Sequence, residues 1–200
     1  MTLAGWEVRL VLRKVTVLNG IPGDGYPGFE EGLAHIVGEQ NASLRYESFT
    51  LREMSIRYCC GCWACWVKTP GECAQKDDMP TLLKSIIGSD LTVFVSPVTM
   101  GFVSAYTKQA MDKLVPLIHP YIGIVEGEHH HHARYEHYPR FGLILIDPEA
   151  KTIGELGIVT DIFRRTALNI KTKLAFAGLS DGSAEVLRDE TGRVEWISQG

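Results

Sequence analysis

Short apolar runs constrain the fold of this chain more than any other feature. Residues 91–95 (LTVFV), 141–146 (FGLILI) and 173–178 (KLAFAG) contain few polar residues and show no polar alternation. Strands that face water on one side alternate apolar and polar residues, whereas unbroken apolar runs are typical of parallel strands covered on both faces. The sequence therefore predicts a buried parallel sheet.

Helical patterns separate these runs, and two earlier segments, 13–18 (RKVTVL) and 43–53 (SLRYESFTLRE), predict further strands. Strands that alternate with helices indicate a parallel sheet with helices on both faces. We predict an α/β fold, a flavodoxin-like doubly wound sheet of five parallel strands in the order 2-1-3-4-5. This domain is expected to cover residues 1–180, and residues 181–200 predict a C-terminal β-hairpin tail. The predicted helices cover residues 29–39, 77–88, 104–118 and 154–170.

Composition excludes several classes of protein. The 200 residues carry a formal net charge of −4, which leaves no basic footprint for nucleic acid. No apolar run approaches the roughly 18 residues of a membrane-spanning helix. The first residues lack the apolar core and cleavage site of a signal peptide, so a cytoplasmic location is expected. Clustered cysteines in such a compartment favour metal binding or catalysis over disulfides.

Two loops are candidate binding sites, because ligands of doubly wound sheets bind beyond the carboxyl ends of the strands. The loop after residues 13–18 is rich in glycine and runs into a helix, an arrangement that offers backbone N–H groups to an anion. It contains no Ser, Thr, Lys or Arg, and Asp24, Glu30 and Glu31 would repel phosphate. In the second loop, after residues 91–96, Gly101 would let the backbone approach a flat ligand. Pro97 is expected to stop the preceding strand.

All five cysteines lie between residues 59 and 73. Cys59, Cys62, Cys65 and Cys73 follow the spacing C-x2-C-x2-C-x7-C, which can direct four thiolates at one iron–sulfur cluster. The same residues could instead bind zinc, act as a redox dithiol or pack as small apolar side chains. Cys60 fits no ligand spacing and is predicted to be a packing residue.

A histidine-rich insert follows the third predicted helix, with His129–His132 in one run and His137 nearby. Such tracts can bind metal ions, but a solvated or subunit-contacting loop is the preferred interpretation.

The cysteine run through Asp77-Asp78-Met79, followed by residues 89–113, resembles the NADPH-dependent FMN reductase and iron–sulfur flavoprotein family. The resemblance implies a flavodoxin-like oxidoreductase that binds FMN, takes electrons from NAD(P)H or a protein donor, and forms a homo-oligomer, a dimer or tetramer. It implies no acid–base residue, since the flavin itself accepts hydride. It implies that the four-cysteine motif can hold a [4Fe-4S] cluster. Because the cysteine segment follows the second predicted strand, we expect it on the carboxyl side of the sheet, near the flavin or at a subunit contact beside it.

The resemblance also assigns flavin contacts to three loops. The phosphate loop maps onto Asn19, Gly20, Ile21 and Pro22, the ring and ribityl contacts onto Pro97, Val98, Thr99, Met100 and Gly101, and the third loop onto Asp147 with Pro148. The family usually reads G-S-P-R in the phosphate loop, whereas here Ile21 replaces the hydroxyl and no arginine follows Pro22. A second hypothesis is therefore a binding or sensor protein of the same fold without flavin.

Overall fold

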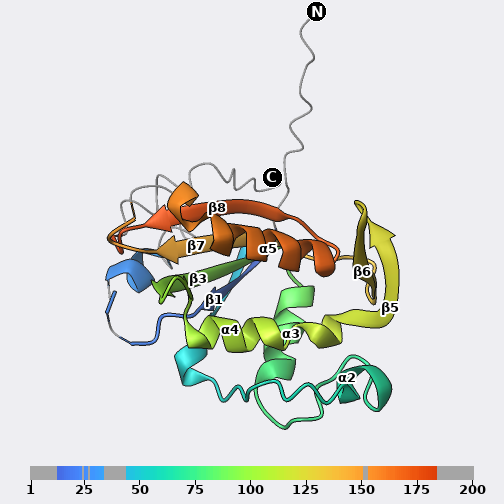
Figure 1. The fold of residues 1–200 in the computed structure, drawn as a ribbon. Coiled ribbons are helices and arrows are strands. Elements are labelled where there is room, and N and C mark those ends of the chain that lie inside the picture. The colour runs from blue at the N-terminus through green and yellow to red at the C-terminus, as the bar shows by residue number, and fades with distance from the viewer. Residues whose placement is uncertain (1–12, 24, 27, 34–43, 151–152, 184–200) are drawn as a thin grey trace, which may run out of the picture.

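The computed structural model describes residues 13–23, 25–26, 28–33, 44–150 and 153–183 (Figure 1). Residues 184–200, most of the hairpin tail expected over residues 181–200, lie outside this part of the chain. The division of the chain at residue 180 stays a prediction. Within the described ranges, no helix is long and apolar enough to cross a membrane.

Five parallel strands form the central sheet in the order β2-β1-β3-β7-β8, and β4 pairs with β3 as an antiparallel extension. Counted along the chain, the parallel strands have the predicted order 2-1-3-4-5. The strands are β1 (Lys14–Asn19), β2 (Arg45–Thr50), β3 (Leu91–Thr99), β4 (Phe102–Val103), β7 (Arg140–Ile146) and β8 (Leu174–Ser180). The helices are α2 (Ala64–Val67), α3 (Met79–Ile87), α4 (Ala105–Asp112) and α5 (Gly157–Asn169), with 3-10 turns η1 (Leu51–Glu53), η2 (Val115–Leu117) and η3 (Ile153–Leu156).

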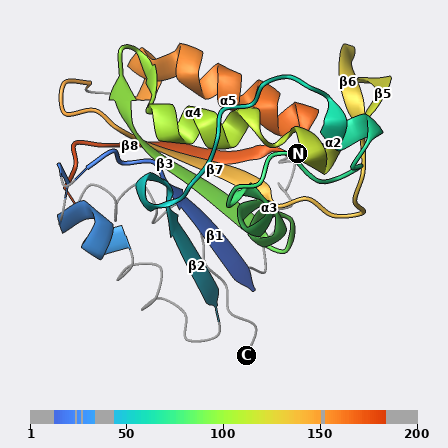
Figure 2. The same ribbon diagram turned by 90° about the horizontal axis from the view of Figure 1, so that it is seen from below.

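Both faces of the sheet are buried, as the unbroken apolar runs predict. Helices α3, α4 and α5 cover one face, where Phe94 of β3 meets Phe141 and Phe163 edge-on, with ring centroids 5.1 and 5.2 Å apart. On the opposite face, the helical residues 28–33 contribute Phe29 and Leu33 to a second core (Figure 2). Alternate side chains along each strand thus pack into two apolar layers, one on each face of the sheet.

Proline placement corrects two predicted boundaries. Pro97 does not stop β3: it stands opposite Ile146 of β7, just before β3 changes partner from β7 to β4. Its fixed φ suits an extended strand, and its missing N–H matters least at the end of a ladder. The helix predicted over residues 104–118 instead ends at Asp112, and Pro116 lies in η2, since proline and the residue before it disfavour a continuing helix.

The histidine-rich insert is a β-hairpin rather than a loop. Strands β5 (Ile118–Val125) and β6 (Glu128–Ala133) form a separate two-stranded antiparallel sheet beside α5 and α2 (Figure 1). Glu126 and Gly127 connect them with φ of 49° and 81°, the backbone of a tight primed hairpin turn. Strand β6 could not be predicted from its composition, because histidine has little β propensity. Its side chains alternate in burial but not in residue type.

Candidate functional site

Three of the predicted binding loops meet at the carboxyl edge of the sheet. In the ladder, Asn19 at the end of β1 stands beside Val95 of β3, and Pro97 stands beside Ile146, the last residue of β7. The chain segments that follow these strand ends are therefore neighbours, and we call Asn19–Pro22, Pro97–Gly101 and Asp147 together the strand-end site. Its position is the switch point where ligands of doubly wound sheets bind.

The loop after β1 is held by a dense set of hydrogen bonds. The Gly20 N–H donates to the Val95 carbonyl at 2.8 Å, and the Ser104 hydroxyl donates to the Gly20 carbonyl at 2.5 Å. The Asn19 side-chain oxygen accepts the Ile21 N–H at 3.0 Å. A Cβ on Gly20 would lie 1.8 Å from the Thr107 hydroxyl oxygen, so only glycine fits where the loop meets α4.

An arginine from another element compensates the acidic charge of this loop. Arg52 of η1 binds the Glu30 carboxylate through both terminal nitrogens, at 2.6 and 3.1 Å, and also donates to the Ile21 carbonyl at 3.3 Å. The hydrogen bond from Arg52 lowers the pKa of Glu30 although partial burial opposes it, and Asn19 adds a further bond. Glu30 therefore does not present the uncompensated charge that the sequence indicates. Arg52 was missed because it follows Ile21 by 31 residues.

The predicted loop after β3 is a tight hairpin. Val98 and Thr99 pair with Val103 and Phe102 of β4, and Met100 and Gly101 form the turn, with φ of 51° and 79°. Met100 is fully exposed at its tip. The hairpin thus presents a fixed backbone and one free apolar side chain at the strand-end site.

Asp147 closes the strand-end site after β7. Its backbone N–H donates to the Ser180 carbonyl of β8 at 2.9 Å, and its carboxylate accepts the backbone N–H groups of Glu149 and Ala150 at 3.0 and 3.3 Å. The carboxylate is thus occupied with shaping its own turn, so Asp147 would offer a ligand mainly its backbone.

These features fit a flavin mononucleotide. The ring requires a flat backbone surface at the switch point, which the β3–β4 hairpin supplies. Of the acidic residues that would repel a phosphate, Glu30 is compensated by its ion pair with Arg52. Without Ser, Thr or Arg in the loop itself, the phosphate would depend on the backbone N–H of Gly23, since the Gly20 and Ile21 N–H groups are bonded within the loop and Pro22 has none.

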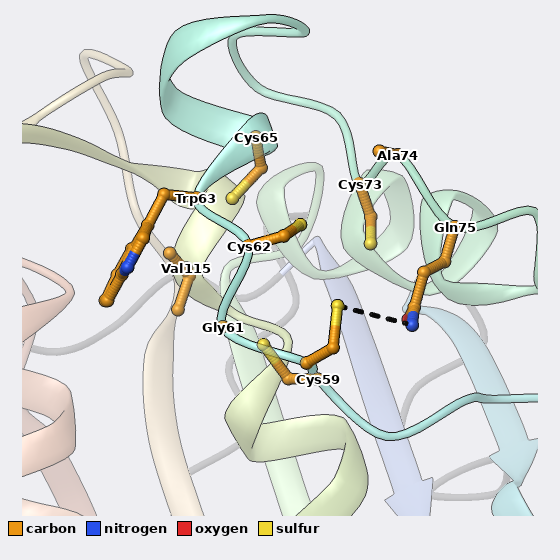
Figure 3. Close-up of a pocket in the computed structure, with 10 residues that line it drawn as sticks. Cys59, Gly61, Cys62, Trp63, Cys65, Cys73, Ala74, Gln75 and Val115 are labelled. Carbon is orange, nitrogen blue, oxygen red and sulfur yellow. Dashed lines mark hydrogen bonds between the residues drawn. The ribbon is translucent and has the colours of Figure 1, made fainter.

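All five cysteines line one small cavity of about 80 Å³, which we call the thiol cavity (Figure 3). Its walls are completed by Gly61, Trp63, Ala74, Gln75 and Val115. Trp63 has a left-handed backbone (φ 58°) that turns the chain into α2, so that residues on both sides of it reach the cavity. Cys60, predicted to be a packing residue, also lines the cavity and is exposed.

The thiols differ in their environments. A hydrogen bond from the backbone N–H of Ala64, together with a bond from the Cys60 side chain, lowers the pKa of Cys62. Burial raises the pKa of Cys65, and the nearby thiols Cys73 and Cys59 add to this effect. Among the described residues, no three His, Cys, Asp or Glu side chains are arranged around a single metal ion. The donor set, soft thiolates in an apolar cavity, fits an iron–sulfur cluster.

The cysteine segment was expected on the carboxyl side of the sheet, and this prediction is wrong. After β2 the chain runs back along α4, where the Gln109 side chain donates to the Ile56 carbonyl at 3.2 Å. The N-terminus of α4 contacts the strand-end site through Ser104, whereas Val115, beyond its C-terminus, lines the thiol cavity. The cavity therefore lies toward the amino ends of the strands, beside the β5–β6 hairpin (Figure 1).

An aromatic wall joins the cavity to this hairpin. The ring of Trp63 stacks on Trp66 with centroids 4.8 Å apart, and Trp66 meets His131 of β6 at 4.7 Å. The Trp66 indole N–H donates to the Val115 carbonyl at 3.1 Å. The histidine run thus supports the wall of the cavity through His131, a contact that no sequence spacing revealed.

Comparison with known proteins agrees with this arrangement. The family model for NADPH-dependent FMN reductase matches residues 13–137. An iron-sulfur flavoprotein of Archaeoglobus fulgidus is 35% identical over 80 residues, covering 40% of this chain and 36% of that protein. One from Methanocaldococcus jannaschii is 37% identical over 74 residues, covering 37% of each chain. The chain thus spans little more than a third of the length of these two relatives.

Solved structures share the fold at low sequence identity. The NAD(P)H:quinone oxidoreductase of Methanothermobacter marburgensis superposes with a TM-score of 0.62 at 13% identity, covering 96% of this chain and 100% of that one. An FMN-dependent NADH-azoreductase of Bacillus anthracis, in complex with FMN, gives 0.59 at 13% identity, covering 92% and 96%. The family match spans more than half of the chain, and the chain belongs to the NADPH-dependent FMN reductase family.

Proposed function

We propose that this chain is a flavoprotein oxidoreductase that binds FMN at the strand-end site and passes electrons from NAD(P)H or a protein donor to an acceptor. The observation that carries the proposal is the juxtaposition of β1, β3 and β7, which brings the three predicted flavin loops together at the switch point. Family membership and the names of its relatives support it.

The residues of the strand-end site have distinct roles in this proposal. FMN, when bound, supplies hydride and electron acceptance. Among the described residues 19–23, the backbone N–H of Gly23 is free to receive the phosphate in this proposal, because the Gly20 and Ile21 N–H groups are already bonded and Pro22 has none. Arg52 compensates the charge of Glu30. Pro97–Gly101 present their backbone to the flavin ring, and the exposed side chain of Met100 contacts the apolar surface of that ring. Gly20 keeps the loop close to α4.

We further propose that the thiol cavity holds a [4Fe-4S] cluster on Cys59, Cys62, Cys65 and Cys73. These residues have the spacing of a compact cluster motif, and they share one cavity with apolar walls. Cys65 and Cys73 are partly buried, whereas Cys59 and Cys62 are exposed, so the site is open to solvent on one side. The name of the matched relatives, iron-sulfur flavoprotein, points the same way.

An anaerobic spectrum tests both parts. The purified chain is mixed with FMN, and separately with iron and sulfide, and its visible absorption and iron content are measured. We expect flavin bands, a broad brown absorption with about four irons per chain, and bleaching of the flavin by NADPH or NADH. A chain that ignores FMN would overturn the flavin proposal and support the flavin-free sensor. Zinc uptake or thiol oxidation without iron binding would overturn the cluster.

Assembly into a dimer or tetramer is also part of the proposal. Large apolar side chains are exposed on β5 and α5, including Tyr121, Ile122, Ile124 and Ile158. Exposed apolar side chains of this size are available for contacts with other chains. Sedimentation of the purified chain at several concentrations would show a species of two or four copies, and a purely monomeric profile would contradict it.

A further inference from the structure

Two buried hydroxyl groups lie between the loops that the proposed function assigns to the flavin ring and to its phosphate. Ser96 and Ser104 are 0% and 2% exposed. Ser96 directly precedes Pro97–Gly101, which we call the ring loop, and Ser104 stands at the start of α4. Burying a hydroxyl is costly unless it is hydrogen-bonded, so the partners of these two groups show which parts of the chain they hold.

The Ser96 hydroxyl connects the ring loop to α4. It donates to the Pro97 carbonyl at 2.9 Å and accepts the Ser104 N–H at 2.8 Å. A serine hydroxyl has one hydrogen to donate, so the bond to Pro97 leaves it as the acceptor toward Ser104. The first carbonyl of the ring loop is therefore tied, through one side chain, to the residue that caps α4.

The Ser104 hydroxyl continues this connection to the phosphate loop, Asn19–Pro22. It donates to the Gly20 carbonyl at 2.5 Å and accepts the Thr107 N–H at 3.3 Å, which makes it the N-terminal cap of α4. The Gly20 N–H donates in turn to the Val95 carbonyl of β3. Both polar backbone groups of Gly20 are thus bonded, one to β3 and one to α4, which fixes the start of the phosphate loop relative to both elements.

These bonds form one connection from the ring loop to the phosphate loop, in the order Pro97, Ser96, Ser104, Gly20. Every link is a short hydrogen bond, and no long side chain with free rotation takes part. FMN carries its ring and its phosphate on one molecule, so it gains most affinity from loops that already stand at the matching separation. Ordering the loops on binding would instead cost conformational entropy and weaken the complex.

We propose that Ser96 and Ser104 are positioning residues for FMN, which hold the ring loop and the phosphate loop at one separation. This inference rests on the proposed binding of FMN at the strand-end site. Neither hydroxyl contacts the flavin in this role, because each is buried and bonded to backbone groups. Ser104 acts on the phosphate end of the ligand through Gly20, whereas Ser96 acts on the ring end and, through Ser104, on the phosphate end as well.

Substitutions in the full chain separate the two ends. Ser104→Ala removes the donor to Gly20, and Ser104→Thr keeps a hydroxyl at the same place. Ser104→Gly also removes the hydroxyl but retains most of the capping preference, and so replaces Ser104→Ala if loss of the cap prevents folding. Ser96→Ala removes the donor to the Pro97 carbonyl. The Kd values for FMN and for riboflavin, which lacks the phosphate, are measured by titration of flavin fluorescence.

Ser89→Ala is the matched control. Ser89 is 8% exposed, and its hydroxyl donates to the Ile86 carbonyl at 2.8 Å, so it is also a buried serine bonded to backbone. It lies just before Leu91, where β3 begins, at the end of the strand away from the strand-end site. The substitution should lower the thermal midpoint of unfolding without changing either Kd.

We expect Ser104→Ala to raise the Kd for FMN about 10-fold, the equivalent of one lost hydrogen bond, and to leave the Kd for riboflavin nearly unchanged. Ser96→Ala should weaken the binding of both ligands. Ser104→Thr should bind FMN like the wild type. When Ser96→Ala and Ser104→Ala are combined, the loss for FMN should be smaller than the product of the two single losses, because part of the effect of Ser96 passes through Ser104.

Several results would overturn the inference. Equal rises in the Kd for FMN and for riboflavin in Ser104→Ala would show that Ser104 does not act on the phosphate end. Unchanged Kd values in Ser96→Ala and Ser104→Ala, or an equal rise in Ser89→Ala, would show that the connection has no specific role. A wild-type chain that binds neither flavin would instead remove the proposed function, and it is recognised before any variant is compared.

Discussion

The strand-end site and the thiol cavity both depend on an ion pair, and the two pairs differ in burial. Lys113 and Asp77 are 2% and 0% exposed behind the thiol cavity, whereas Arg52 and Glu30 are 19% and 27% exposed at the strand-end site. Both pairs hold a loop that has no regular structure of its own. Only the second pair can be reached directly by water.

This difference indicates two kinds of site. A fully buried pair has little freedom to rearrange, because either charge alone in the interior would be strongly unfavourable. Lys113 also donates to Gln75 in the cavity wall, and the Lys113–Asp77 pair thus holds the chain behind the thiol cavity in one arrangement. A half-buried pair contributes less and is screened by water, so the Arg52–Glu30 pair can rearrange at smaller cost.

Breaking the buried pair should have the largest effect. Asp77→Asn leaves Lys113 buried without its counter-charge, and we expect the free energy of unfolding in urea to fall by about 3–5 kcal/mol. The exposed pair Lys108–Asp112, one turn apart on α4, is the control. Asp112→Asn should cost less than about 1 kcal/mol. Equal losses in the two variants would contradict the contrast in burial.

Removing the arginine of the other pair should affect a ligand more than the fold. Arg52→Leu leaves the Glu30 carboxylate uncompensated beside the phosphate loop, so the Kd for FMN should rise roughly 10- to 100-fold, the equivalent of a charged hydrogen bond. Riboflavin lacks the phosphate and should lose much less affinity. Adding Glu30→Gln to Arg52→Leu should restore most of the FMN affinity. Equal losses for FMN and riboflavin would show that charge compensation is not the reason.

Gly20 tests how tightly the phosphate loop is tied to α4. Gly20→Ala places a Cβ against the Thr107 hydroxyl, and we expect a loss of about 1–3 kcal/mol in unfolding free energy from overpacking. Thr107→Ala in the same chain should recover part of it. A Cβ on Gly23 meets no atom within 4 Å, so Gly23→Ala serves as the control. If both glycine variants behave alike, the close contact does not determine the loop.

Protonation of Glu30 in acid should break the Arg52–Glu30 pair, and this should have the smallest effect on stability of the changes considered. The pKa of Glu30 is lowered in the folded chain, chiefly by the bond from Arg52, so its contribution is present above the ordinary glutamate pKa and is lost as pH falls through the folded value. At neutral pH, the free energy of unfolding of the wild type should exceed that of Glu30→Gln by about 1 kcal/mol. This difference should disappear below about pH 4. A difference that persists in acid would mean that charge is not its source.

The sequence predicts the sheet because burial leaves a local signature. Unbroken apolar runs such as 91–95 and 141–146 identify buried parallel strands, and helical spacing identifies what lies between them. The strand-end loops follow from strand order alone. The end of β3 was predicted wrongly, because Pro97 remains inside the strand. Whether a strand accepts a proline depends on which partner strand lies beside it.

Local spacing also identified the four-cysteine motif, but it could not place it. The direction of the chain after β2 depends on contacts of residues 51–58 with α3 and α4, such as that between Gln109 and Ile56. No pattern in residues 59–73 encodes those contacts. The hairpin of His129–His132 was missed for a similar reason, because its side chains alternate in burial without alternating in chemistry.

By itself, the sequence determined the fold class, the strand-end loops and the set of cysteines, because each of these depends on patterns of residues close together in the chain. Only the tertiary structure decided that the thiols lie at the other end of α4, and that Arg52 and Lys113 support the two sites. Those partners come from distant elements, and an ion pair between distant residues has no spacing to read. It arises when packing of the apolar core brings their elements together.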